Sequence, residues 1–572
     1  MNRCGFIMCL FTNEHPVCKT VQGWVGRGSL TSVLGTAMNS KFQKSLRCRV
    51  VSILDGLGCR TGWLLLLLAG VYFVGFGLIA SKGVVTNDEL FTLYIARLPH
   101  FRDVWAALAT GAEQTPPLFY ALSRADIYAF GASGLALRLP EMLAFALMCV
   151  CLFHIVARRT STIYGFLALL FPFMTTAFNY PFEARAYALV LAFSAFGMLC
   201  WIWAAEARCR ALALAGLAVS LAAAISCHYY AVLSLFPIGL GEVVRSFRRK
   251  RIDAGVWIAL VLSMSPLLAF LPLIESARKF SPNFWAKPHW SSMGYFYEHF
   301  LLSPSAVPLL AIFLAIATYR AFQRLEAEPG KMQAQAPIPM HEAAAAAGFL
   351  LIPVVAVVMA KTVVGAFSDR YALPAVIGLS IIVGWGLCTS LAGRRAPAVV
   401  LGFLLLAFLA VKEAQTYRRV TAMRSLQVST YEFLENNAYG DAPIVISAPM
   451  DFTELSYEAP RPLSERLTYL ADPSLALRYT GTDDPERGLV EMKSWAGLNV
   501  QPFQAFVASG QKCYVYVVDY PDQYAWVIHG FEAAHWRIRL EKWQDGMVLF
   551  SATPGGAAGG IATRHKPDEE VP

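Results

Sequence analysis

The sequence predicts an α-helical, polytopic membrane protein of about eleven transmembrane helices, followed by a soluble α/β domain. Two observations support this fold class. The chain of 572 residues is 56% hydrophobic and only 15% charged, with a mean hydropathy of +0.48, whereas soluble domains carry about 25% charged residues. The stretch 63–80 has no charged residue, so it can cross a hydrocarbon core of roughly 30 Å.

Further apolar runs follow this first one, which excludes a cleaved signal peptide at 63–80. A signal peptide would be shorter and would be followed by soluble sequence. The expected later spans are 137–157, 163–180, 184–205, 211–227, 229–244, 254–274, 306–322, 343–361, 371–392 and 397–411.

One apolar segment, "PPLFYALSRADIYAFGASG", is left out of these spans. Arg124 and Asp126 lie in its middle, and charges at bilayer depth are costly. If this segment crossed, the basic clusters of the later loops would lie outside the cell. We therefore expect a helix that lies along the membrane surface.

The chain divides into three predicted regions. Residues 1–60 form a cytoplasmic extension that is disordered or arises from a misassigned start, with Met38 as the alternative first residue. Its cysteines lack a C-x-x-C spacing, which disfavours a metal site. Residues 61–412 form the transmembrane domain, and residues 413–572 form a periplasmic α/β domain with a disordered tail.

The α/β domain is predicted from short runs of β-branched and aromatic residues. "APIVISA" and "KCYVYVVDY" are typical of buried strands, and "WRIRLEKW" with "GMVLFSA" indicates a closing hairpin. "SLQVSTYEFLENNAYG" has apolar residues at helical spacing and ends at Gly440. No glycine fingerprint for nucleotide binding follows either strand.

The distribution of basic residues predicts the orientation. The net charge of +9 is concentrated in short loops between apolar runs, as in cytoplasmic loops, and not on one face with aromatic residues, as in nucleic-acid-binding proteins. No nucleic-acid partner is expected. The composition favours the bacterial inner membrane, with 81–136, 275–305, the turns near residues 183, 228 and 370, and the C-terminal domain outside.

Asp88 and Glu89 follow the first span on the outer side, and three interpretations remain open. They can cap the helix that begins there. One of them can be a general base whose pKa is raised by the low dielectric of the membrane surface. The adjacent acids can also hold a divalent metal ion, which we disfavour.

Arginines recur at the outer ends of the spans, at Arg138, Arg185 and Arg370. A single arginine there is often an interface anchor whose head group reaches the water. Three guanidinium groups at one boundary can instead bind a phosphate. Glu183 lies beside Arg185, and His228 lies at another outer end, where a polar substrate can bind.

A carboxylate and several arginines at one membrane surface suit sugar transfer from a lipid phosphate. The phosphate leaving group needs positive charge beside it and no general acid. The acceptor hydroxyl is a poor nucleophile and needs a base. In-line attack at the anomeric carbon would invert its configuration.

The ordered motifs "NDELF", "QTPPLFYAL", "LRLPEML", "EARAYAL", "CHYYAV" and "DRYALPA" resemble those of the membrane-embedded GT-C glycosyltransferases. The chain is most similar to the bacterial branch related to protein O-mannosyltransferases and lipid A aminoarabinose transferases. The resemblance covers roughly 61–411. Each motif is weak alone, but six in order are a strong signal.

The resemblance implies a glycosyltransferase of the hexosyltransferase type, with a polyprenyl-phosphate sugar as donor, a glycan, lipid or protein as acceptor, and no cofactor. Asp88 would be the catalytic base with Glu89 beside it, and Arg185, Arg370 and Arg138 would bind the donor phosphate. Further substrate contacts are expected from Glu183, Tyr187 and His228. Many relatives have His where this chain has Thr115, so no acceptor-binding role is assigned there.

The alternative function is a transporter or flippase for a lipid-linked or anionic solute, in which the arginines bind and do not catalyse. Internal repeats and broken helices would favour that class. The sequence shows no convincing repeat between its halves and no obvious Gly/Pro-broken helix.

Overall fold

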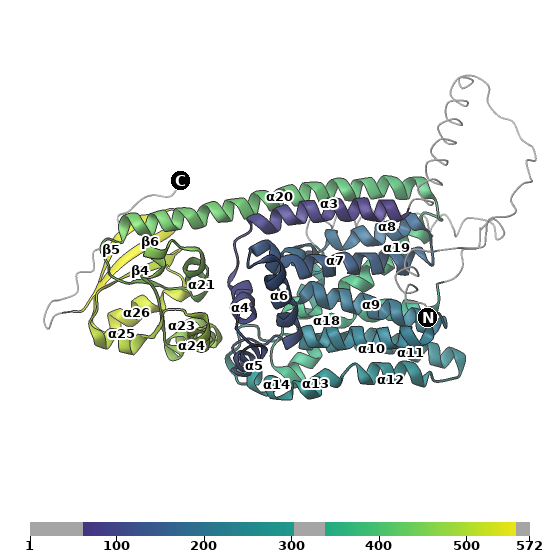
Figure 1. Ribbon diagram of the computed structural model, residues 1–572, viewed down its shortest axis with the longest axis horizontal. Coiled ribbons are helices and arrows are strands. Elements are labelled where there is room, and N and C mark those ends of the chain that lie inside the picture. The colour runs from purple at the N-terminus through teal and green to yellow at the C-terminus, as the bar shows by residue number, and fades with distance from the viewer. Residues whose placement is uncertain (1–60, 303–337, 556–572) are drawn as a thin grey trace, which may run out of the picture.

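The computed structural model describes residues 61–302 and 338–555 (Figure 1). Within these ranges six helices are long and apolar enough to cross a membrane. They are α3 (Thr61–Lys82), α7 (Gly134–Ala157), α9 (Tyr187–Ala205), α10 (Arg210–Cys227), η3 with α11 (Tyr229–Arg249) and α20 (Arg395–Asn437).

Two further spans are bent, which corrects the expectation of no broken helices. One pair, Ala254–Ala269 and Leu271–Arg278, bends by 60°, and the other, Met340–Leu350 and Ile352–Val364, bends by 50°. The second residue of each second segment is a proline, Pro272 or Pro353, and a proline cannot donate the backbone hydrogen bond that would continue the helix. The elements concerned are α12 (Ala254–Leu262), α13 (Ser265–Ala269), α14 (Leu271–Arg278), α17 (Met340–Leu350), α18 (Ile352–Met359) and η7 (Ala360–Val364).

Every predicted span within the described ranges falls on a helix or a bent pair, and 306–322 lies outside them. Six to eight of these helices are long enough to cross, fewer than the predicted number. Shorter apolar helices occupy two predicted spans, α8 with η1 (Thr162–Met174) and α19 (Ala375–Ser390).

Short helices cover one end of this bundle. α6 (Pro117–Phe130) is the segment predicted to lie on the membrane surface, and it is not among the candidate spans. It packs against α4 (Asn87–Ala96), α5 (Phe101–Ala109) and α7. The turns η2 (Thr176–Phe182), η4 (Ser281–Asn283), α15 (Ser292–Tyr295), η5 (Phe296–Phe300) and η8 (Asp369–Ala372) complete the helical part.

The C-terminal domain is built on a six-stranded sheet of order β3-β2-β1-β4-β6-β5. β1 to β4 are parallel, and β5 and β6 form the predicted antiparallel hairpin. The strands are β1 (Ile444–Ile446), β2 (Leu467–Ala471), β3 (Val500–Pro502), β4 (Cys513–Val518), β5 (Arg537–Gln544) and β6 (Met547–Thr553). The predicted strands "APIVISA" and "KCYVYVVDY" contain β1 and β4, whereas β2 and β3 were not predicted.

Helices surround this sheet, which buries an apolar core on each of its faces. They are α21 (Pro449–Glu458), α22 (Arg461–Ser464), α23 (Pro473–Thr480), α24 (Asp484–Ala496), α25 (Phe503–Ser509), η9 (Gln523–Ala525) and α26 (Trp526–Ala533). α21 and α24 contact α4, so the domain packs on the end of the bundle that carries the acidic pair.

α20 connects the two parts as one uninterrupted helix of 43 residues (Figure 1). The predicted boundary between residues 412 and 413 lies inside it, and the predicted helix that ends near Gly440 is its last third. The first part of α20 packs against α3 and α8, and its last part contributes Tyr431 and Leu434 to the core of the C-terminal domain.

Candidate functional site

The N-terminus of α4 is fixed by Glu89. Its carboxylate accepts hydrogen bonds from the backbone N–H of Thr86 at 3.0 Å and of Ala184 at 2.8 Å. Two further bonds come from Arg138, at 2.7 and 2.6 Å. Glu89 is only 1% exposed, so in this structure it caps and anchors α4.

The predicted phosphate contact of Arg138 is not compatible with this geometry. Arg138 is 3% exposed, and Glu89 and backbone carbonyls accept its hydrogen bonds. The carbonyls belong to Ala80, Gly83 and Val84. Because these donors are already used inside the protein, Arg138 anchors the acidic loop instead.

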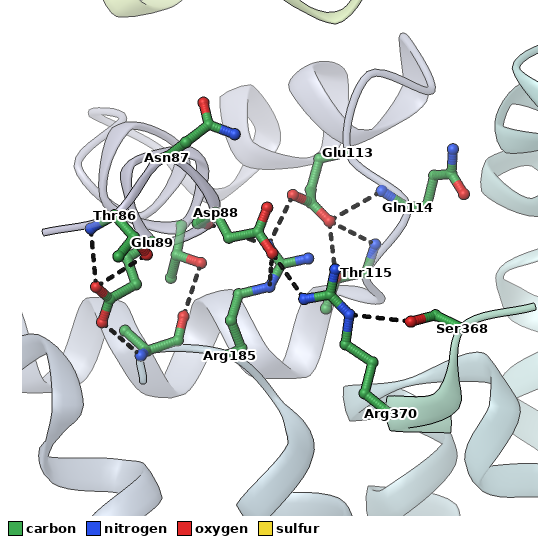
Figure 2. A network of polar contacts seen from close by, with 12 residues as sticks. Thr86, Asn87, Asp88, Glu89, Glu113, Gln114, Thr115, Arg185, Ser368 and Arg370 are labelled. Carbon is green, nitrogen blue, oxygen red and sulfur yellow. Dashed lines mark hydrogen bonds and ion pairs between the residues drawn. The ribbon is translucent and has the colours of Figure 1, made fainter. Parts of the chain in front are cut away.

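Asp88 points the other way, toward two arginines (Figure 2). Its Oδ2 accepts a hydrogen bond from Arg370 at 2.8 Å and lies 4.0 Å from Nε of Arg185. The side chain of Asp88 is 41% exposed and lines a cavity. The adjacent acids therefore have different environments, one buried and saturated, the other open to a ligand.

Glu113 is a site residue that the sequence analysis missed. Its Oε2 accepts a hydrogen bond from Arg185 at 3.1 Å, while its Oε1 accepts one from the Thr115 hydroxyl at 2.7 Å. Arg185 also donates to the backbone carbonyl of Asp88 at 3.1 Å. Glu113 thus positions Arg185 from the loop before Pro116. The only sequence feature that could have indicated this role is that Glu113 lies close to the motif "TPPL".

The electrostatics of Asp88 differ from the expectation. Burial raises the pKa of its carboxyl, but Arg185 and Arg370 outweigh that effect and hold the pKa below its usual value. The expectation of a raised pKa is therefore wrong for the protein without ligand. Asp88 is ionised at neutral pH, and its basicity depends on what the two arginines contact.

A cavity of about 440 Å³ opens in front of Asp88. Its polar end is formed by Asp88, Glu113, Arg185 and Arg370. Its apolar side comes from the two bent spans, with Leu267, Ile274, Met359, Val363 and Val364 among the lining residues. The C-terminal domain closes another side through Pro449, Met450, Asp484, Pro485, Gly488 and Leu489.

Aromatic side chains support the arginine end of this cavity. The guanidinium carbon of Arg370 lies 5.7 Å from the ring centre of Tyr187 and 5.8 Å from that of Trp285. His228 lines the cavity next to Tyr187. Glu183, by contrast, is not among the lining residues, and burial raises its pKa to about 7.

The arrangement does not favour the metal alternative at the acidic pair. The carboxylate of Asp88 pairs with Arg370 at 2.8 Å, whereas that of Glu89 pairs with Arg138 at 2.6 Å and is buried. Among the residues that the structure describes, no three His, Cys, Asp or Glu side chains gather where they could hold one ion.

No protein-family model matches the chain, and no curated protein matches it. Among solved structures it is similar to ArnT from Cupriavidus metallidurans bound to undecaprenyl phosphate. The TM-score is 0.51 at 14% identity, over 86% of this chain and 98% of that one. This is the GT-C fold.

The archaeal oligosaccharyltransferase AglB from Archaeoglobus fulgidus, in complex with an inhibitory peptide and a dolichol-phosphate, matches with a TM-score of 0.38 at 12% identity, over 86% of this chain and 74% of that one. The assignment depends on the ArnT likeness alone. The GT-C fold and the apolar helices together make this chain a multi-pass membrane protein.

Proposed function

We propose that this protein is an inverting glycosyltransferase that moves a sugar from a polyprenyl phosphate to an acceptor hydroxyl. One observation carries the proposal: Asp88, Arg185 and Arg370 meet at the polar end of a cavity that has an apolar wall. A base and a pair of permanent cations are the groups that this reaction requires. The bound undecaprenyl phosphate named for ArnT supports the donor class.

In the proposed reaction, the acceptor oxygen attacks the anomeric carbon while the bond from that carbon to the phosphate oxygen breaks. The proton of the acceptor hydroxyl goes to Asp88, and the electron pair leaves on the polyprenyl phosphate. Arg185 and Arg370 stabilise the charge that grows there. Attack opposite the leaving group inverts the anomeric configuration.

The donor also changes Asp88. Without ligand, Arg370 donates to Asp88 at 2.8 Å. A phosphate that binds Arg185 and Arg370 shares these cations and adds negative charge, and both effects raise the pKa of Asp88. Donor binding therefore makes Asp88 a stronger base at the moment when the acceptor is deprotonated.

The two bent spans provide a path for the lipid chain. α13 and α14 contribute Leu267 and Ile274 to the cavity, and α18 and η7 contribute Met359 and Val363. Leu268 and Val363 are 73% and 63% exposed on the same elements, as expected for residues that face lipid. The polyprenyl chain would leave the cavity between these spans.

The acceptor would be a glycan, lipid or protein hydroxyl of the cell envelope, and the hexosyltransferase type remains part of this proposal. The outer face of the bacterial inner membrane is the proposed location. The proposed location follows from the positive-inside pattern of the basic loops. Ion pairs through shared acids bring Arg158 and Arg159, and likewise Arg210 and Arg245, together at the ends of their helices.

The bent spans also favour the transporter alternative, since broken helices often line transport sites. A transporter would bind a lipid-linked or anionic solute at Arg185 and Arg370 without a chemical step. Asp88 would then be a counter-ion only. The experiment below separates the two functions.

Asp88→Asn should keep the fold, because the side chain has the same shape and the α4 N-terminus is capped by Thr86 and Glu89. Single-turnover transfer from undecaprenyl-phosphate hexoses should fall by roughly 10²- to 10⁴-fold, while donor affinity is kept. In the matched variant Arg185→Lys, donor affinity itself should fall, because lysine lacks the planar fork. Near-normal transfer by Asp88→Asn would refute the base assignment. If the wild type moves a lipid-linked or anionic solute across the membrane but transfers no sugar, the transporter function is favoured.

A further inference from the structure

The C-terminal domain contacts the residue that precedes Asp88. Asn87 is the first residue of α4, and its backbone N–H donates to Glu454 of α21 at 2.8 Å. The buried hydroxyl of Thr453 donates to the side-chain oxygen of Asn87 at 2.7 Å. Both main-chain and side-chain groups of Asn87 are therefore held by a helix 366 or more residues away in sequence.

This contact completes the fixation of the α4 N-terminus. The first N–H groups of a helix have no partner within the helix. Glu89 accepts from Thr86, and Glu454 accepts from Asn87. Asp88 thus lies between two residues whose positions are set, one by α21 and one by Arg138. The backbone of Asp88 is therefore fixed on both sides, which sets the position from which its side chain reaches Arg370.

α21 also packs along α4 and borders the cavity. The rings of Tyr457 and Tyr94 meet edge to face at 6.3 Å, and Arg97 lies 5.8 Å from the Tyr457 ring centre. Pro449 and Met450, at the start of α21, line the cavity itself. One helix of the outer domain therefore touches both the support of Asp88 and the space for substrates.

We propose that Glu454 and Thr453 are positioning residues for Asp88, so that the C-terminal domain is part of the catalytic site. The proposal rests on the transferase function given above. It assigns the outer domain a role in the geometry of the base, beyond any role in acceptor binding.

The titration of Glu454 provides a second measurement, the pH dependence of the transfer rate, which would not change if the contact were only structural. Burial, together with Asp451 on its own helix and Glu89 and Asp88 on α4, raises the pKa of Glu454 to about 7. Tyr431 of α20 also interacts with Glu454, in a group that includes Glu458 and Arg424. Glu454 therefore changes charge near neutral pH, directly beside the N-terminus of α4.

The first test measures hydrogen exchange of the peptide that covers 84–95 in the detergent-solubilised full chain, without ligand. Glu454→Ala should increase exchange there, because Asn87 loses its acceptor, and Thr453→Val should show a smaller increase. Glu458→Ala is the matched control: it lies on the same helix but pairs with Arg424 at 3.6 Å. Unchanged exchange in Glu454→Ala would refute the contact.

The second test measures single-turnover transfer from undecaprenyl-phosphate hexoses to membranes of a deletion strain. Glu454→Ala should lower the rate by roughly 10- to 100-fold with unchanged donor affinity, since small displacements of a catalytic group have effects of this size. Glu454→Gln keeps an acceptor oxygen, so it should restore the rate and reduce the inflection near pH 7, leaving the part that arises from Glu183. Increased exchange with a normal rate would overturn the positioning role, whereas absence of transfer in the wild type would count against the proposed function alone.

Discussion

At the scale of single residues, burial separates the charged groups that anchor α4 from those that line the cavity. Glu89 and Arg138 are buried and use their hydrogen bonds on each other and on the backbone. Asp88, Arg185 and Arg370 keep part of their surface open to the cavity. Asp88 and Glu89 are adjacent in sequence but face different sides of α4. Glu89 faces the buried Arg138, whereas Asp88 faces the cavity and can contact a ligand.

Glu183 gives a pH prediction at this scale. Burial raises its pKa to about 7, above the usual value of 4.5, so the folded state binds a proton more tightly than the unfolded state. Its contribution to the free energy of unfolding is therefore largest at low pH and declines as pH rises from about 4.5 to about 7. Glu183→Gln should make the melting temperature less dependent on pH between pH 5 and pH 8. An unchanged pH dependence would show that Glu183 is not the group responsible.

At the scale of elements, α4 is held in place by the ion pair beneath it. Removing one partner of a buried pair leaves an uncompensated charge and costs about 3–5 kcal/mol. Glu89→Ala should therefore destabilise the protein by roughly that amount, measured by denaturation in detergent. The double variant Glu89→Gln with Arg138→Met should recover part of the loss. Arg102→Ala, which removes an exposed ion pair with Asp103, should have almost no effect.

Local sequence predicted elements well where apolar periodicity decides the structure. Every described span, β1, β4 and the β5–β6 hairpin follow from such runs. Sequence spacing could not distinguish Arg138 from Arg185, because which arginine remains open depends on the carbonyls of 80–84 that fold over it. The roles of Glu113 and Glu454 could not be predicted from the sequence for the same reason. Their roles arise from contacts across the fold and not from a local pattern.

At the scale of the whole molecule, α20 determines how the C-terminal domain faces the cavity. One inserted residue in a helix rotates everything after it by about 100°. An alanine inserted after Ala422, on the exposed part of α20, should turn Glu454 away from Asn87. Transfer should fall as in Glu454→Ala, and exchange of 84–95 should rise. An alanine inserted after Gly440, in the exposed loop beyond the helix, should leave both quantities close to wild type. Equal loss at both places would mean that any insertion disturbs the domain.

The unbroken α20 also sets how far the C-terminal domain lies from the bilayer. At about 1.5 Å per residue, a helix of 43 residues is about 65 Å long, roughly twice the thickness of a hydrocarbon core. Its last part therefore lies beyond the hydrocarbon core, where Tyr431 and Leu434 pack in the core of the C-terminal domain. Because no break separates the span from this last part, α20 holds the C-terminal domain at a fixed distance from the bilayer, at the end of the bundle that carries α4.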